Sequence, residues 1–221
     1  MKASFADLFA PKDLALKLQC RFDAARLAAD LARMEDRWWE RHLSDYHDGN
    51  WHSISLLAPG GERSNQLSRG GAIAGTEALG RCSYVPEVIN AFPGEKNRVR
   101  FLKLRAGGAI YPHSDPMHQV HEDLVRIHVP VRTNPLMDFR VHGKRLQMQP
   151  GEAWFVDVRF RHSVSNPGES DRVHLVIDIV ASPELRHMLR ASDSAGTALL
   201  TGYFLKHSLP RRVVRWLKIG N

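Results

Sequence analysis

Apolar residues recur at two different spacings along the chain, and the change of spacing separates a central region from both ends. Between residues 12 and about 43 they recur every three or four positions, which is the period of a helix buried on one side. The residues that set this period are Leu14, Leu18, Phe22, Ala25 and Ala29. Helical character returns at Pro183 and continues through the rest of the chain. We therefore predict helical segments at both ends.

The central region contains short apolar runs separated by turns. Pairs such as His142-Gly143 and Pro150-Gly151 are typical turn formers, and Pro86 opens a short predicted helix over residues 86–92. Several short strands at this spacing indicate an antiparallel sandwich or barrel. The predicted strands cover residues 51–57, 99–104, 124–131, 139–141, 153–158 and 172–180.

Residues 58–76 are rich in glycine, serine and other polar residues. A loop of this length inside a compact domain is often functional. We predict that it forms a lid or contacts a substrate.

The predicted organisation is one domain in three parts. An N-terminal helical segment covers residues 1–48, a β-core covers residues 50–181, and a C-terminal helical segment covers residues 182–221. A chain of 221 residues with 43% apolar content is large enough to bury a substantial core.

Several classes of protein are disfavoured because the sequence lacks their features. No apolar run reaches the length of a membrane-spanning helix, and no apolar segment follows a basic start, so we expect a soluble cytoplasmic protein. Cys20 and Cys82 are the only cysteines and stand far apart, which argues against a thiolate zinc site or a disulfide framework. Any bound metal must therefore have nitrogen and oxygen ligands.

A formal net charge of +7 suggests acidic partners. Much of the excess lies near the C-terminus, where basic and apolar residues alternate as in an amphipathic helix packed on a core. The basic stretches lack interleaved aromatic residues, so a nucleic-acid-binding module is disfavoured. The basic residues concerned are Arg211, Arg212, Arg215 and Lys218.

One tripeptide, His113-Ser114-Asp115, has the spacing of a metal site. In extended chain its first and third side chains point to the same side. His162 follows the predicted strand 153–158 and offers a second imidazole. Two histidines and one carboxylate leave open positions on a metal, as in non-haem iron(II) oxygenases. Because the chain has 12 histidines, this tripeptide alone is a weak signal.

Arg172 strengthens that interpretation, because it begins an apolar strand that should lie in the core. A buried guanidinium needs an anionic partner, and its planar fork suits a carboxylate. A dicarboxylic 2-oxo acid fits, with one end on iron and the other on Arg172. Arg126 and His128 share one face of another predicted strand, and a surface ion pair and a satisfied core imidazole are their alternative readings.

Four segments together resemble the aspartyl/asparaginyl β-hydroxylase family, which includes bacterial proline hydroxylases. The resemblance spans roughly residues 50–185 and implies a mainly β protein with flanking helices around a double-stranded β-helix of the jelly-roll or cupin type. The segments are His113-Ser114-Asp115, RIHVPV (126–131), PGEAWFVDVRFRHSVSN (150–166) and RVHLVIDIV (172–180).

The resemblance implies that His113 and His162 bind the metal and that Arg172 binds the distal carboxylate of 2-oxoglutarate. It places Arg126 and His128 near the metal-chelating end of the co-substrate or near a substrate carboxylate. Asp115 supplies the carboxylate that the animal members lack, so the chain is more similar to the bacterial amino-acid hydroxylases.

A departure from the animal members is Leu102, which stands where they place a co-substrate-binding serine. The co-substrate contacts of that strand are therefore open. Of the remaining histidines, we expect His118 and His121 to be exposed, and His174 to support the site or to belong to the core.

The expected activity is that of an Fe(II)- and 2-oxoglutarate-dependent dioxygenase, which uses O2 and needs no side-chain general base. It would hydroxylate a small amino acid or an amino-acid derivative, free or carrier-tethered, and release succinate and CO2. Trp51, Ser53 and the 58–76 loop are candidates for substrate contact. The alternatives are a peptidyl Asp/Asn-type hydroxylase and a metal cupin without oxygenase activity, against which Arg172 argues.

Overall fold

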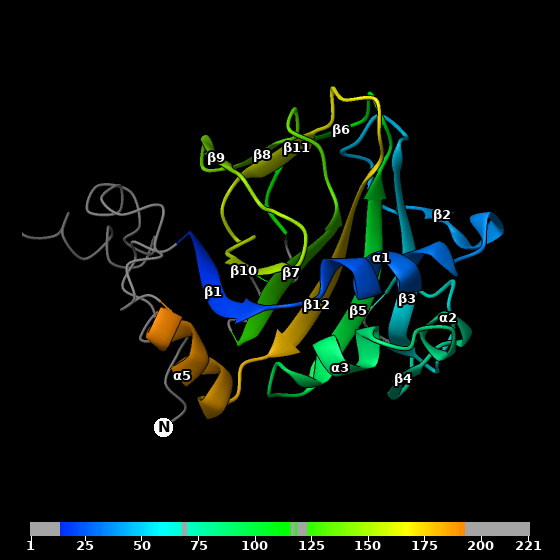
Figure 1. Ribbon diagram of the computed structural model, residues 1–221, viewed down its shortest axis with the longest axis vertical. Coiled ribbons are helices and arrows are strands. Elements are labelled where there is room, and N and C mark those ends of the chain that lie inside the picture. The colour runs from blue at the N-terminus through cyan, green and yellow to red at the C-terminus, as the bar shows by residue number, and fades with distance from the viewer. Residues whose placement is uncertain (1–13, 68–69, 116–117, 119–122, 193–221) are drawn as a thin grey trace, which may run out of the picture.

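The computed structural model describes residues 14–67, 70–115, 118 and 123–192 (Figure 1). The helices are α1 (Ala24–Ala32), α2 (Glu77–Gly80), α3 (Val85–Asn90) and α5 (Pro183–Ser192), with a short 3-10 helix at Asp36–Trp38. The strands are β1 (Ala15–Arg21), β2 (Glu40–Arg41), β3 (Trp51–Pro59), β4 (Ile73–Gly75), β5 (Lys96–Leu104), β6 (Ala109–His113), β7 (Leu124–Arg132), β8 (Asp138–Val141), β9 (Lys144–Leu146), β10 (Glu152–Val156), β11 (His162–Ser165) and β12 (Arg172–Val180).

Within the described residues, the strands form two antiparallel sheets. The major sheet has the order β1-β10-β7-β12-β5-β3-β2, with β4 paired to β3. The minor sheet has the order β6-β11-β8-β9 and lies at the top of the view in Figure 1. Apart from β3 and its partners β2 and β4, neighbours in the major sheet are not consecutive in sequence, as expected of a jelly roll.

Two hydrophobic clusters lie on opposite faces of the major sheet. The first packs the sheet against α1, α3 and α5, which lie on its outer side. The second fills the space between the two sheets and includes Leu102, Leu104, Phe139 and Trp154. Burial of both faces explains why β7 and β12 read as nearly continuous apolar runs.

Strand β12 shows how the sequence assigns residues to these two layers. Its odd-numbered residues from Val173 to Ile179 belong to the outer cluster. The even-numbered positions therefore face the space between the sheets, because successive side chains alternate. Val176 there belongs to the inner cluster, and the other even positions as far as Asp178 carry Arg172, His174 and Asp178, all buried.

The prediction of one helix from residue 12 to about residue 43 is correct only for α1, because a strand precedes α1 and a short 3-10 helix and strand β2 follow it. Residues 15–21 form β1, which pairs with β10, and α1 begins only after Asp23, whose side chain accepts hydrogen bonds from the backbone N–H groups of Ala25 and Arg26. Leu16 and Leu18 face the outer cluster at a spacing of two, so the period of this segment is that of a strand.

The remaining differences concern short elements. The predicted 58–76 loop contains β4, which pairs with the end of β3. Strands β2, β6, β9 and β11 were not predicted. The basic segment around Arg211 and the histidine at position 121 lie outside the described residues. No helix in the described ranges is long and apolar enough to cross a bilayer.

Candidate metal centre

His113, Asp115 and His162 converge at one end of the minor sheet. His113 ends β6 and His162 begins β11, and the two residues are direct partners across these strands. Asp115 is positioned by its backbone N–H, which donates to the carbonyl of Val158 at 2.9 Å. One potential ligand atom from each of the three side chains lies within 4.8 Å of the others. The predicted triad is therefore close enough to hold one metal ion.

The two imidazoles are oriented by backbone carbonyls. Nδ1 of His113 lies 2.7 Å from the carbonyl oxygen of Tyr111, and Nδ1 of His162 lies 3.0 Å from that of Phe160. A carbonyl only accepts, so each Nδ1 carries the proton and each Nε2 has a free lone pair. The Nε2 atoms lie 3.3 Å and 3.7 Å from Asp115 Oδ1. Burial lowers the pKa of His162 to about 4, so this imidazole is neutral at neutral pH.

The two oxygens of Asp115 have different surroundings. Oδ1 faces the two imidazoles, while Oδ2 accepts a hydrogen bond from Nη1 of Arg126. Burial acts to raise the pKa of Asp115, but Arg126 and His113 outweigh it and hold the pKa well below its ordinary value. The carboxylate is therefore ionised, with one oxygen directed at the metal position.

Aromatic rings support the triad from the side of β3. Tyr46 stacks on His113 with ring centroids 3.8 Å apart, and His42 stacks on Trp51 at 3.5 Å. Trp51 is buried, and its indole N–H has no hydrogen-bond partner among the described residues.

Arg172 lies between the two sheets and is 2% exposed. Its Nη2 donates to Nδ1 of His174 at 2.8 Å, and its guanidinium lies over the Phe139 ring at 5.6 Å. Its Nε is buried without a partner, and no carboxylate in the described part of the chain forms an ion pair with it. Burial lowers the pKa of Arg172 to about 9. An isolated buried cation is costly, so this site fits an anionic ligand.

His174 and His128 extend the contact that Arg172 makes. Nδ1 of His174 lies 3.3 Å from Nδ1 of His128, and burial lowers the pKa of both well below the ordinary value. Because His174 Nδ1 accepts from Arg172, His128 must be the donor in this contact. Nε2 of His128 is then a buried acceptor, and it has no partner among the described residues.

Arg126 connects the triad to a buried cluster that sequence reasoning missed. Its Nε and Nη2 donate to Asp178 at 2.7 and 3.1 Å, in addition to its bond to Asp115. Arg98 and Arg100 also donate to Asp178, at 3.1 and 3.3 Å. A surface ion pair is thus the wrong reading of Arg126, which is 7% exposed.

A signal for this cluster exists in the sequence. Arg98 and Arg100 alternate with apolar residues, and Asp178 interrupts the apolar run of β12. Charged residues at a spacing of two within a buried strand indicate paired charges on its inner face.

The expectation that His118 is exposed is wrong. His118 is 2% exposed. Its Nδ1 lies 3.0 Å from the carbonyl oxygen of Leu124, and its Nε2 lies 3.5 Å from Oδ1 of Asp178.

A cavity of about 170 Å³ opens beside the triad. Some of the residues that line it were predicted as site residues from the sequence, and others were not. Trp51 and two residues of the 58–76 segment, Gln66 and Leu67, are on its wall. Ser53 is not on this wall; it is buried, and its hydroxyl is without a partner among the described residues. The lining residues are His42, Leu43, Tyr46, Trp51, Gln66, Leu67, Arg98, Arg100, Asp115 and Arg126.

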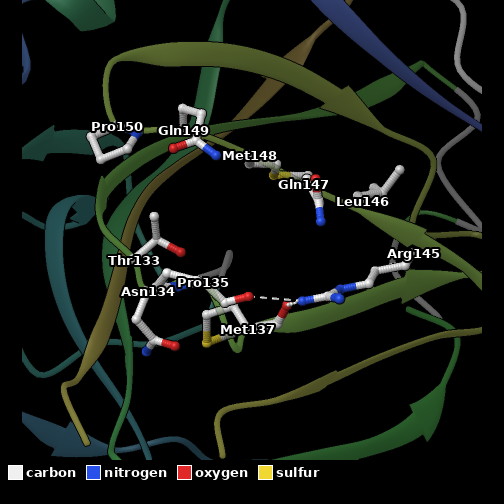
Figure 2. A pocket seen from close by; sticks show the side chains of 10 residues that line it. All are labelled: Thr133, Asn134, Pro135, Met137, Arg145, Leu146, Gln147, Met148, Gln149 and Pro150. Carbon is white, nitrogen blue, oxygen red and sulfur yellow. Dashed lines mark hydrogen bonds between the residues drawn. The ribbon is translucent and has the colours of Figure 1, made fainter. Parts of the chain in front are cut away.

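A second cavity, of about 360 Å³, lies between the 133–137 and 145–150 segments (Figure 2). It lies at the end of the minor sheet opposite to the triad. The cavity is near Asp138, which pairs with Ser165 at the last residue of β11, whereas His162 at the first residue of β11 pairs with Val141. Its charged lining residue, Arg145, donates to the carbonyls of Pro135 and Met137 at 3.0 and 2.6 Å. None of the triad residues lines this cavity, so the smaller one is the candidate substrate site.

Two curated bacterial enzymes are similar to this chain. L-proline cis-4-hydroxylase of Rhizobium meliloti (strain 1021) is 28% identical over 174 residues, which cover 77% of this chain and 62% of that enzyme. L-proline cis-3-hydroxylase 2 of Streptomyces sp is 24% identical over 163 residues, which cover 71% of this chain and 56% of that enzyme. The chain thus spans about six-tenths of the length of these relatives.

Solved structures share the fold at low sequence identity. A 2OG-Fe(II) oxygenase family oxidoreductase from Burkholderia pseudomallei has a TM-score of 0.53 at 14% identity, covering 82% of this chain and 93% of that one. HygX from Streptomyces hygroscopicus, solved with nickel, 2-oxoglutarate and hygromycin B bound, has a TM-score of 0.50 at 9% identity, covering 78% and 84%. The predicted mainly β, jelly-roll core with flanking helices is confirmed.

A family model described as "Aspartyl/Asparaginyl beta-hydroxylase" matches residues 21–182. That match includes the triad and the three strands, β5, β7 and β12, that carry the buried arginines and Asp178. The chain therefore belongs to the aspartyl/asparaginyl β-hydroxylase family, as its sequence resemblance predicted.

Proposed function

We propose that this chain is an Fe(II)- and 2-oxoglutarate-dependent dioxygenase that hydroxylates a C–H bond of a small amino acid or an amino-acid derivative. The proposal rests on the presence of two features between the same two sheets. A histidine–aspartate–histidine triad can hold a metal ion, and a buried arginine near it has no carboxylate partner among the described residues. A metal cupin without a diacid co-substrate has no use for Arg172.

In this proposal His113, Asp115 and His162 hold iron(II), and Arg172 binds the distal carboxylate of 2-oxoglutarate. Iron(II), 2-oxoglutarate and dioxygen together supply an oxidant that can break a C–H bond, with succinate and carbon dioxide as co-products. The side chains position these groups, and none of them must act as a general base.

The supporting residues have roles that follow from their contacts. Arg126 holds Oδ2 of Asp115 and leaves Oδ1 for the metal. Tyr46 and Trp51 cover the triad with aromatic rings and limit the access of water. The indole N–H of Trp51 is an unused donor on the cavity wall, which supports a contact with substrate or co-substrate.

The relatives named as proline hydroxylases support a small-molecule substrate, either free or tethered to a carrier. The proposal includes a cytoplasmic location, with which the free thiols of Cys20 and Cys82 are compatible.

The test is an anaerobic preparation of the full chain with Fe(II) and 2-oxoglutarate, mixed in air with a set of amino acids and short peptides. We expect succinate formation coupled to the gain of one oxygen atom by an amino acid, measured by mass spectrometry. Hydroxylation of peptides alone would replace the small-molecule substrate with a peptidyl one. Failure of the metal-loaded protein to bind 2-oxoglutarate in calorimetry would refute the oxygenase assignment.

A further inference from the structure

Asp178 is a buried carboxylate that reaches the triad through one arginine. It lies on the inner face of β12, where it is the direct cross-strand partner of Arg126 on β7. Nε and Nη2 of Arg126 donate to Oδ1 and Oδ2 of Asp178 at 2.7 and 3.1 Å. The third nitrogen of this guanidinium, Nη1, donates to Oδ2 of Asp115. One arginine therefore connects the two carboxylates.

The two bonds to Asp178 fix the direction of the third. A guanidinium is planar, and a pair of parallel hydrogen bonds to one carboxylate sets both its plane and its rotation within that plane. The pairing of β7 with β12 holds the two backbones in place. With Nε and Nη2 bound to Asp178, Nη1 of Arg126 is directed at Asp115. Asp178 thus determines where Arg126 donates.

The arginine cluster consists of Arg98, Arg100 and Arg126, and its other two members contact Asp178 without contacting Asp115. Arg98 and Arg100 donate from β5 to Oδ2 of Asp178 at 3.1 and 3.3 Å, and within the described ranges neither forms a hydrogen bond or an ion pair with Asp115. Burial acts to raise the pKa of Asp178, but Arg126 and further basic groups around it outweigh burial and hold the pKa well below its ordinary value. Asp178 is therefore a fixed anion that Arg126 links to the triad.

The contact on Oδ2 of Asp115 decides how much room the metal has. Two imidazole nitrogens and one carboxylate oxygen take half of the positions of an octahedral metal. A chelating 2-oxo acid takes two more and leaves one for dioxygen. If Oδ2 also bound the metal, that last position would be filled. Because Oδ2 accepts from Arg126, Oδ1 is the oxygen left for the metal, and it faces both imidazoles.

We propose that Asp178 is a positioning residue, which fixes Arg126 on Oδ2 of Asp115 and thereby keeps one metal position open for dioxygen. In this role it makes Asp115 a single-oxygen ligand. The inference rests on the proposed oxygenase function and adds to it a residue whose hydrogen bonds go to the arginine cluster rather than to the triad.

Nitric oxide tests for the open position, because it binds iron(II) where dioxygen would and gives a signal in electron paramagnetic resonance. The full chain is loaded anaerobically with Fe(II), with and without saturating 2-oxoglutarate, and is then exposed to nitric oxide. Calorimetry establishes beforehand that 2-oxoglutarate binds each protein. We expect the wild type to give the signal in both states. Asp178→Asn should give it without 2-oxoglutarate, and with 2-oxoglutarate the signal should be reduced about tenfold or more.

Two substitutions distinguish geometry from charge. Asp178→Asn removes the charge and one of the two acceptors, whereas Asp178→Glu keeps the charge and displaces the carboxylate by one methylene group. Both break the paired bonds to Arg126, so both should lose the signal when 2-oxoglutarate is bound. Asp30→Asn is the matched control, since Asp30 is also 0% exposed and accepts from the backbone N–H groups of Tyr84 and Val85. That variant should keep the signal in both states.

Loss of the Asp178 charge leaves three buried arginines with one carboxylate fewer, which destabilises the fold. Thermal melting establishes that each variant is folded. The double variant Arg98→Met with Asp178→Asn removes one charge of each sign, so the net charge of the buried layer is kept. It should lose the signal in the same way as Asp178→Asn alone.

The outcomes separate this inference from the function on which it rests. If the Asp178 variants bind 2-oxoglutarate and keep the wild-type signal, the positioning role is refuted while the oxygenase remains. If Asp178→Glu alone keeps the signal, charge rather than geometry is responsible and the inference is wrong. Loss of the signal in Asp30→Asn would equally overturn it. If the wild type itself does not bind 2-oxoglutarate, the oxygenase proposal fails first.

Discussion

Asp115 divides its two oxygens between a metal position and an arginine. Such a division fixes the plane of the carboxylate, since rotation about its bond to Cβ would break the contact with Arg126. The residue therefore contributes orientation as well as charge.

Asp115→Ala should lower the affinity for a divalent metal by at least about tenfold, because it removes the anionic ligand and leaves Arg126 facing the site. Manganese(II) titration followed by electron paramagnetic resonance measures this affinity directly. Asp138→Ala, which removes a carboxylate that pairs with Arg140, is the control. Equal affinities in the two variants would show that the carboxylate is dispensable here.

His42 carries a pH dependence of stability. Burial, with help from Arg100 and Arg98, lowers its pKa from 6.5 to about 2. As pH falls below 6.5, the unfolded chain takes up a proton at this position and the folded protein does not. The unfolded state is therefore favoured progressively as pH falls from about 6.5 toward about 2, by up to about 1.4 kcal/mol per pH unit.

Urea unfolding at several pH values between about 7 and about 5 tests this prediction. The free energy of unfolding of the wild type should fall with pH more steeply than that of His42→Gln, which has no imidazole to protonate at this position. Parallel curves would contradict the prediction.

At the scale of elements, the long strands could be predicted from the sequence and the short ones could not. Strands β7 and β12 have bounds within one residue of the prediction, because burial on both faces produces long apolar runs. Strands β6 and β11 are short and partly polar, and the candidate metal ligands His113 and His162 stand at their ends. His113 and His162 were thus proposed as ligands from their chemistry, and the strands that carry them were not predicted.

The same contrast holds for the candidate site. Arg172 was proposed as a site residue from the sequence, because a cation at the start of an apolar strand is unusual. Arg98 and Arg100 were missed because they contact Asp178, which is 80 and 78 residues away in sequence and adjacent only through the pairing of β5 with β12. Pairing between strands distant in sequence is not encoded in local spacing.

The docking of β1 on β10 depends on Gly151, which has a φ of 79°. Its N–H donates to the carbonyl of Pro130, and its carbonyl accepts from Phe22 at 2.7 Å. A Cβ at this position would lie 2.2 Å from the carbonyl oxygen of Phe22. The glycine therefore provides both a left-handed conformation and room for a close approach.

Gly151→Ala should destabilise the protein more than Gly143→Ala does. Gly143 has a φ of 81°, but an added methyl group there would meet no atom within 4 Å, so this variant measures the conformational cost alone, about 1–2 kcal/mol. The steric clash at Gly151 should add about 1–3 kcal/mol, measured by urea unfolding. Equal losses of unfolding free energy in the two variants would show that β1 can move away from Gly151 without an energetic cost.

At the scale of the whole molecule, the candidate site lies between the two sheets and draws on both. The minor sheet supplies His113 and His162, and the major sheet supplies Arg172 and the arginine cluster. A ligand that contacts both sheets binds only the folded protein and should stabilise it.

With saturating manganese(II) present throughout, addition of 2-oxoglutarate should therefore raise the melting temperature further, by the equivalent of about 2.7 kcal/mol at a concentration 100 times its dissociation constant. Arg172→Met should abolish this rise, and the ligand-free variant should be at least as stable as the wild type, because an unpaired buried cation has been replaced by an apolar group. Arg140→Met, at an exposed position, should keep the full response. Scanning calorimetry measures all three proteins.

The alternation of inner and outer side chains along β12 also limits which changes of sequence this protein can accept during evolution. A deletion or insertion of one residue within the strand would turn its functional side chains toward the helices and bring aliphatic ones into the site. Changes in substrate range should therefore accumulate in the connections that line the cavity beside the triad, such as the segments carrying Leu43 and Leu67, while the length of this central strand stays constant.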